Sequence, residues 1–209
     1  MNRLDGMLDH GSVRCEQHQT REANERMASE LATHELTGVR YFPLASASGE
    51  DPVEWDFGVW HQPTMGVELT TTNGSVYSLI WNQYGDWGFG VDLYDLPASN
   101  HLIEGADAPA VVVSDHSAWA GILRRPLSVS FNWNDYGTGL PPCPEAIRLS
   151  TDQASLWVVA ADWSRSLGRT SIQLGMDDLL VVFDDRFVEA LGLNDRLHGT
   201  EASVEPNRG

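Results

Sequence analysis

Residues 67–94 read VELTTTNGSVYSLIWNQYGDWGFGVDLY, and this stretch decides the fold. Apolar and polar residues alternate along it, which is the period of a β-strand. A three-residue loop at 72–74, with Gly74 in the left-handed conformation, places Leu69 opposite Tyr77 and keeps the apolar residues on one face. A two-residue Asn-Gly turn would set the same apolar residues opposite polar ones. The sequence therefore predicts a hairpin with the longer loop.

The same loop type at residues 83–85 extends this hairpin into a three-stranded meander. It sets Trp81 opposite Trp87. By the same register, Leu79 opposes Phe89. Such cross-strand pairs each contribute roughly 0.2 to 1 kcal/mol. The aromatic residues are therefore assigned to a core face, which comprises Met65, Val67, Leu69, Tyr77, Leu79, Trp81, Trp87, Phe89, Val91 and Leu93.

The opposite face of the meander is mixed, because Gly88 and Gly90 lie there beside Asp92 and Tyr94. Glycines inside a strand commonly mark a bulge or the close approach of another backbone or a ligand. One interpretation is that the N-terminal helix covers this face, since an amphipathic helix must bury its apolar stripe. The other is that the glycines leave a trough for a small ligand, bordered by the loop at 135–145.

Three further patterns predict strands beyond the meander. Residues 147–161 repeat the apolar pattern of 67–81 at an offset of 80, and the same loop type would place Leu149 opposite Trp157. The segment LSVSFNWN alternates strictly, as a half-buried strand does. At the end of the β region, SIQL and LLVVF predict a last hairpin with a GMDD turn, and LLVVF reads as a central strand because it lacks polar alternation.

Helical signals flank the β region. Residues 20–35 predict an amphipathic helix with Thr20 as N-cap, and Asp184 or Asp185 caps a short helix through FVEAL. We therefore predict a mainly β chain, an antiparallel two-sheet sandwich or strongly curved sheet of about 8–10 strands built on two similar hairpins, with one N-terminal helix and one short C-terminal helix. The predicted boundaries are a flexible leader at 1–19, the helix at 20–35, a single β domain at 36–195 and a disordered tail at 196–209.

The charge of the chain restricts its partners. Thirty acidic residues stand against thirteen basic ones, all of them arginine, for a formal net charge of -17. So negative a surface repels phosphate backbones and anionic lipids, and it speeds the encounter with cationic partners at low salt. The sequence thus predicts a basic protein partner, no nucleic acid and no membrane. A GC-rich coding bias explains the absence of lysine equally well.

The sequence contains no sorting signal of the common kinds. The start, MNRLDGMLDHGSVRCEQHQ, has no apolar segment of the kind that a secretory signal needs, and no stretch reaches the roughly 20 apolar residues that span a membrane. Cys15 lies in the polar leader and Cys143 in a proline-rich loop, which does not fit a disulfide framework. We expect a cytoplasmic protein.

Common catalytic motifs are absent from the chain. It has no GxGxxG, GxxxxGK[ST], GxSxG or HExxH motif, and without lysine it cannot form a Schiff base. The adjacent residues Asp115, His116 and Ser117 suit a cap or a turn, because neighbours on a strand point to opposite faces and cannot form a catalytic triad. Cys143 has no arginine or histidine near it in sequence to activate its thiol.

Two weaker constellations involve histidines. His10, Cys15 and His18 share the flexible leader and lack an ordered fourth ligand, so they do not predict a metal site. Acid-base chemistry of the kind that hydrolyses glycosides would need paired carboxylates with a histidine brought in by the fold, from the set Asp86, Asp92, Asp95, His61 and His116. The sequence favours a non-enzymatic protein, with no catalytic residue, metal or cofactor assigned.

The preferred function is an acidic cytoplasmic binding protein that neutralises or inhibits a basic partner, as an immunity protein does. The alternative is a small-ligand or carbohydrate-binding β protein, or a hydrolase, that uses the trough and the 135–145 loop. A structural subunit of a larger assembly is a third reading. The candidate ligand-binding residues are Gly88, Gly90, Asp92, Tyr94, Asn132, Asn134, Asp135 and Tyr136.

Overall fold

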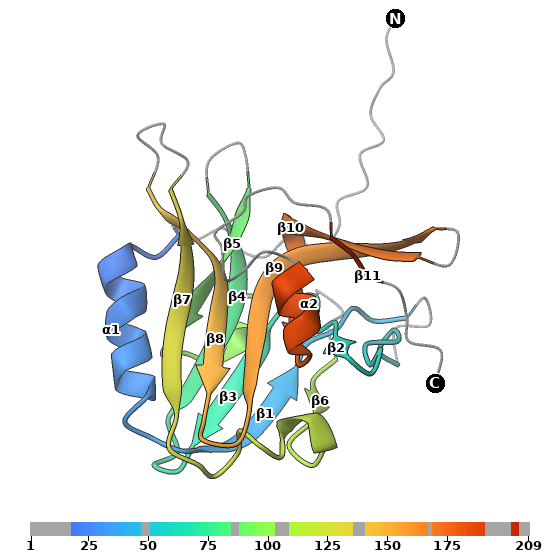
Figure 1. Cartoon of the computed structure of the whole chain (residues 1–209). Coiled ribbons are helices and arrows are strands. Elements are labelled where there is room, and N and C mark those ends of the chain that lie inside the picture. The colour runs from blue at the N-terminus through green and yellow to red at the C-terminus, as the bar shows by residue number, and fades with distance from the viewer. Residues whose placement is uncertain are drawn as a thin grey trace, which may run out of the picture.

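Two antiparallel β-sheets pack face to face in a sandwich (Figure 1). The structure is a computed structural model that describes residues 18–46, 51–84, 88–102, 109–135, 141–166, 169–190 and 202–204. The first sheet has the order β5-β4-β3-β1-β6, with β1 Leu36–Tyr41, β3 Val67–Thr71, β4 Val76–Gln83, β5 Phe89–Tyr94 and β6 Val111–Val112. The predicted mainly β, two-sheet architecture is confirmed.

The second sheet has the order β11-β10-β9-β8-β7, and β2 also pairs with β10. Its strands are β2 Trp60–His61, β7 Ser128–Asn134, β8 Cys143–Ser150, β9 Ser155–Ser166, β10 Arg169–Val182 and β11 Ala202–Val204. The main core lies between the sheets, because one face of each sheet must bury its apolar side chains against the other. Central members of this core are Leu69, Tyr77, Leu79, Val91, Leu93, Ile147, Leu149, Leu156, Val158 and Leu179.

Helix α1, Arg21–Leu31, closes one open side of the sandwich. The Thr20 hydroxyl accepts a hydrogen bond from the Ala23 N–H at 3.2 Å, which confirms the predicted N-cap. Met27, Ala28 and Leu31 enter the main core, and the helix contacts the edge strands β5 and β7 (Figure 1). The expectation that the apolar stripe of this helix covers the mixed face of the meander is wrong, because the stripe reaches the core between the sheets. The start of the helix does contact that face, since the Asn24 amide donates to Asp92.

The first predicted hairpin is confirmed and the second is displaced. Leu69 pairs with Tyr77, and Gly74 has a φ of +84°, as the three-residue loop requires. In the β4–β5 pair, however, Trp81 lies opposite Val91 instead of Trp87. The Tyr84 N–H donates to the Gly88 carbonyl, so the strands continue beyond the expected loop. The displacement is an even number of residues, so the paired residues of β4 and β5 keep their predicted faces, and Trp87 lies outside the described residues.

Met65 is the exception on the predicted core face. It belongs to a small second cluster on the outer side of the first sheet, with Phe42, Ile80, Tyr94 and Ala98. The short 3-10 helix η1, Ala98–Asn100, contributes Ala98 to this cluster and lies against β4. The mixed face is thus covered by local segments of the chain.

The β8–β9 hairpin departs from the predicted register by one residue. Leu149 pairs with Leu156, and Arg148 pairs with Trp157. Trp157 therefore points away from the main core and packs in an outer cluster with Trp60 and Phe187. The β3–β4 and β8–β9 hairpins are similar, but their loops differ, and the register expected from the repeat is wrong.

The predicted last hairpin is one long strand. Residues 169–182 form β10 without a turn, and the pairing with β9 shifts between Leu174 and Leu179. Gly175 has a φ of +75°, so the GMDD segment is a bulge in the strand, where glycine is favoured for its positive φ. The segment LLVVF has neighbours on both sides, β9 and β2, as expected of a central strand.

The ends of the chain are described in part. Helix α2, Asp185–Ala190, begins after Asp184, whose carboxylate accepts from the Arg186 N–H at 2.8 Å. Where the sequence predicts a disordered tail, residues 202–204 form β11 beside β10. The predicted leader lies outside the described residues, apart from His18 and Gln19. Among the helices that the structure describes, none is long and apolar enough to cross a membrane.

Candidate functional site

Asp92, one of the predicted ligand-binding residues, is the centre of a buried polar network. Its side chain is 0% exposed. The carboxylate accepts hydrogen bonds from the Gln19 N–H at 3.0 Å, from the Asn24 and Asn82 amides at 2.7 Å each, and from the hydroxyls of Tyr84 at 2.5 Å and Tyr94 at 3.4 Å. These donors come from the start of α1 and from β4 and β5. Asp92 therefore ties the helix to the first sheet.

The rest of the predicted trough is also filled. A Cβ atom on Gly90 would lie 2.7 Å from the Cys143 sulfur and 2.9 Å from the Pro144 carbonyl oxygen. Gly88 is buried, and the Tyr94 ring packs against the His101 ring with centroids 4.0 Å apart. The glycine at 90 thus marks the close approach of the β8 backbone, which is neither the N-terminal helix nor the small ligand suggested by the sequence.

The other predicted ligand-binding residues lie on the second sheet. Asn132 and Asn134 are buried, and the Asn134 amide donates to Glu145 at 3.1 Å. Asn134 pairs with Cys143, which packs on Gly90, so the two halves of the predicted set do meet. Asp135 is exposed, and Tyr136 lies outside the described residues. The meeting place is interior, and ligand binding by these residues stays a prediction.

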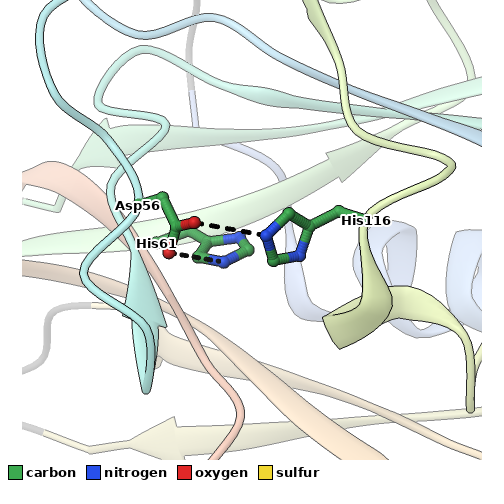
Figure 2. Close-up of side chains that lie close together, drawn as sticks. All are labelled: Asp56, His61 and His116. Atoms are coloured by element: carbon green, nitrogen blue, oxygen red, sulfur yellow. Dashed lines mark hydrogen bonds and ion pairs between the residues drawn. The ribbon is translucent and has the colours of Figure 1, made fainter.

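A different cluster unites Asp56, His61 and His116. Their ligand atoms all lie within 4.8 Å of one another. One Asp56 carboxylate oxygen lies 3.4 Å from the His61 Nε2 and the other lies 3.2 Å from the His116 Nε2, as Figure 2 shows. The two imidazole rings meet edge to face, with centroids 4.6 Å apart.

Local backbone structure places these three side chains. Asp56 and His61 form an isolated antiparallel bridge, and the Phe57 N–H donates to the Trp60 carbonyl at 3.0 Å, so a tight turn brings the two together. His116 precedes the 3-10 helix η2, Ser117–Trp119, and its Nδ1 accepts from the Ala118 N–H at 3.3 Å. The capping role expected for the Asp-His-Ser segment is confirmed.

His61 is held by a chain of buried hydrogen bonds. Its Nδ1 lies 2.9 Å from the Tyr41 hydroxyl oxygen, which accepts from the Trp119 indole N–H at 2.8 Å. Burial lowers the pKa of His61 to about 4, although the nearby Asp56 opposes this shift. Burial also raises the pKa of Tyr41. Both groups are therefore neutral near neutral pH.

The Asp56 carboxylate is oriented and ionised. It accepts from the Gly58 N–H at 2.8 Å, and this hydrogen bond, followed by the influence of the two histidines, lowers its pKa. The side chains of Asp56 and His116 are 42% and 30% exposed, whereas that of His61 is 0% exposed. The cluster thus has a buried end at His61 and an open end at the other two residues.

Aromatic rings enclose the buried end of this cluster. Trp55 lies edge-on to His61 with a centroid distance of 5.1 Å, and Phe183 lies at 4.7 Å. Trp55 also approaches His116 at 6.0 Å. Trp119 lies one residue further away and contacts Tyr41, to whose hydroxyl its indole N–H donates.

A second group of interest is the acidic cluster, defined as Asp162, Asp177 and Asp178 on β9 and β10. Burial and the neighbouring charges of the other two raise the pKa of Asp178 to about 6. The Gln62 amide donates to Asp178 at 2.9 Å, and Gln62 in turn accepts from the Trp163 indole N–H at 2.6 Å. Of the ion pairs among the described residues, none involves this cluster.

The sequence suggested His61 and His116 as partners of other aspartates but missed Asp56. Of those other aspartates, Asp92 belongs to the α1 network, Asp95 is exposed, and Asp86 lies outside the described residues. Asp56 lies in an irregular loop without periodicity, so no pattern pointed to it. The five-residue spacing between Asp56 and His61, with a turn at Gly58, is the one local signal.

Comparison of the chain with protein families, with curated proteins and with solved structures gives no match.

Proposed function

We propose that this chain is a non-enzymatic acidic binding protein that docks a basic protein partner through the acidic cluster and the aromatic side chains beside it. The observation that carries the proposal is the state of Asp178, whose pKa is raised to about 6 by burial and by two like charges. A cationic side chain placed there would relieve this repulsion. The formal net charge of -17 would steer such a partner toward the protein.

The surroundings of the acidic cluster suit a protein interface. Trp163 and Phe57 are half-buried and pack with ring centroids 4.6 Å apart. Aromatic residues are enriched at the centres of interfaces, where they bury a large area at little entropic cost. Through Gln62, the indole of Trp163 is linked to Asp178 by two hydrogen bonds. The aromatic and the charged parts of the surface are thus fixed relative to each other.

The proposal includes a cytoplasmic location and a neutralising role, in which the partner's basic site is covered. Nucleic acid and membrane surfaces are not proposed as partners, because like charge repels both. The alternative of a small-ligand or carbohydrate site in the trough is favoured by no observation, since Asp92 and Tyr94 are buried and hydrogen-bonded. A titration of tryptophan fluorescence with a panel of sugars would test it.

The test of the main proposal is affinity capture of proteins from native lysate at about 0.05 and about 0.5 M salt, which spans strong and weak charge interaction. The variant Asp162→Asn, Asp177→Asn, Asp178→Asn removes the acidic cluster. A matched control, Glu22→Gln, Glu30→Gln, Asp51→Asn, removes three exposed carboxylates elsewhere. We expect a basic protein on the wild type and on the control at low salt, and its release at high salt.

The cluster variant should lose that partner at both salt concentrations. Equal capture by the cluster variant and the control would show that general charge, and not this surface, holds the partner. Capture that is indifferent to salt, or no captured protein, would contradict the proposal itself.

A further inference from the structure

We propose that Asp56, His61 and His116 bind a divalent transition-metal ion, Zn²⁺ being the first candidate. The proposal is independent of the docking of a basic partner, and it departs from the sequence expectation, which assigns no metal. Two imidazole nitrogens and one carboxylate oxygen are ligand types that suit Zn²⁺ and related first-row ions. Asp56 and His61 come from the turn that leads into β2, and His116 comes from the segment before η2 (Figure 2).

The spacing of the ligand atoms fits such an ion. Ligands about 2.0 to 2.2 Å from a tetrahedral Zn²⁺ ion lie about 3.3 to 3.6 Å from one another. His61 Nε2 lies 3.4 Å from one Asp56 oxygen and His116 Nε2 lies 3.2 Å from the other, and one ligand atom from each residue lies within 4.8 Å of the other two. An ion could therefore enter with small rotations of the exposed Asp56 and His116 side chains.

The buried histidine supplies the second, independent observation. The His61 side chain is 0% exposed, and its Nε2 has no hydrogen-bond partner. A buried polar atom without a partner lowers the stability of the fold, and a bound ion would offset this loss. The Tyr41 oxygen can accept the proton of Nδ1, and this tautomer leaves a lone pair on Nε2 that points toward Asp56. A hydrogen bond at the other ring nitrogen is a common way in which proteins orient metal-binding histidines.

Asp56 and His116, the two exposed ligands, differ in how their hydrogen bonds must change when an ion binds. Asp56 is already held by the Gly58 N–H at 2.8 Å. His116 accepts from the Ala118 N–H through Nδ1, so its Nε2 carries the proton and donates to Asp56. Binding an ion through Nε2 moves this proton to Nδ1 and breaks the contact with Ala118. The cost is two long hydrogen bonds, the one of 3.3 Å from Ala118 and the one of 3.2 Å to Asp56, and the second is replaced by the bonds of both residues to the ion.

Access and charge also favour an ion at this place. The open side of the cluster, at Asp56 and His116, lets an ion enter from solvent and leaves a coordination position for water. The aromatic rings of Trp55 and Phe183 shield the His61 side. With one carboxylate and two neutral imidazoles, the first ligand sphere partly neutralises a divalent cation, and the net charge of -17 attracts it further.

The test is direct binding of Zn²⁺ and Co²⁺ to the full chain after treatment with a chelator. Calorimetry gives the stoichiometry and the affinity, and the visible absorption of Co²⁺ reports the coordination geometry. We expect one ion per chain, and affinities about 100-fold lower or worse in the variants Asp56→Asn and His116→Ala. Both substitutions are at partly exposed positions, and circular dichroism would verify their folding.

Two controls separate this site from other histidines. The variant His34→Ala removes a partly exposed histidine outside the cluster, and it should bind as the wild type does. The variant His10→Ala, Cys15→Ala, His18→Ala removes the three potential ligands of the leader, and it should also retain the ion. Absence of stoichiometric binding would overturn the proposal. Binding that is lost with His10, Cys15 and His18, but survives Asp56→Asn and His116→Ala, would overturn it as well.

Discussion

Asp92 and Asp178 show how two aspartates on strands can have opposite roles. Asp92 is fully buried, yet five hydrogen-bond donors surround its carboxylate. Asp178 is half-buried, has one side-chain donor in Gln62, and lies beside two like charges that raise its pKa. The comparison teaches that the number of donors, more than burial itself, decides whether a carboxylate stabilises the fold.

The largest effect on stability is expected from a substitution of Asp92, the carboxylate that accepts more hydrogen bonds. Asp92→Asn places an amide group among donors and leaves some of them without an acceptor. We expect the free energy of unfolding to fall by about 3 kcal/mol, since hydrogen bonds to a buried charge are strong and their loss is costly. Urea unfolding near pH 7 would measure this. The control Asp95→Asn, at an exposed position outside both groups, should change stability by less than about 0.5 kcal/mol. Similar losses of unfolding free energy in the two variants would contradict the conclusion that the donors around Asp92 stabilise the fold.

Gly90→Ala tests whether the face of β5 that carries Asp92 is closely packed. The new methyl group would lie 2.7 Å from the Cys143 sulfur and 2.9 Å from a carbonyl oxygen, so we expect a loss of about 1 to 3 kcal/mol from overpacking. Gly38→Ala is the matched control, because its methyl group would meet neighbours at an ordinary 3.5 Å. Thermal unfolding of both variants decides the matter. If Gly90→Ala were as stable as Gly38→Ala, the face would be open, and the predicted ligand trough would regain its support.

Asp178→Asn should stabilise the protein, the reverse of Asp92→Asn. The pKa of Asp178 is about 6 when folded and 3.8 in the reference state, so the folded protein binds this proton more tightly. The ionised carboxylate therefore destabilises the folded protein. This destabilisation is absent below the lower pKa and fully present above the higher one. We expect Asp178→Asn to gain about 1 to 2 kcal/mol above pH 6, a value reduced for partial exposure, and little below pH 4.

Urea unfolding of wild type and Asp178→Asn at several pH values would measure this gain. An equal gain at low and at neutral pH would mean that the carboxylate is not under electrostatic stress. The basis of the proposed docking surface would then be lost. A gain confined to neutral pH would mark a residue that is kept at the expense of stability, as binding residues often are.

The sequence predicted the fold best where a single loop geometry was possible. At Gly74 the loop requires a positive φ, and the register of β3 and β4 follows from it. For β4 and β5 the alternation determines the face of each residue and not its partner, because any even displacement keeps the faces. The error between the predicted Trp81–Trp87 pair and the observed partner, Val91, is of this kind.

The alternation of apolar and polar residues could not predict the structure of two other regions. Residues 156–161 of β9 are buried on both faces, so apolar residues follow one another and the pattern contains no information about register. Trp157 was placed on the wrong face for this reason. The Asp56, His61 and His116 cluster depends on two irregular loops, whose meeting is set by tertiary packing. The sequence named the two histidines, but its one local signal for Asp56, the short spacing to His61 across Gly58, was too weak to predict the cluster.

The bulge at Gly175 divides β10 into two segments, and we expect their amide hydrogens to exchange with solvent at different rates. The inner segment, which includes Leu179 and Val181, is part of the main core and pairs with β9 and β2. The outer segment pairs with β9 and β11, and Leu174 belongs to the outer cluster. Because the ladder is interrupted between them, the outer segment can open and close without breaking the inner pairing. The amide protons of the outer segment would then exchange with solvent through local opening. Those of the inner segment would exchange only through global unfolding.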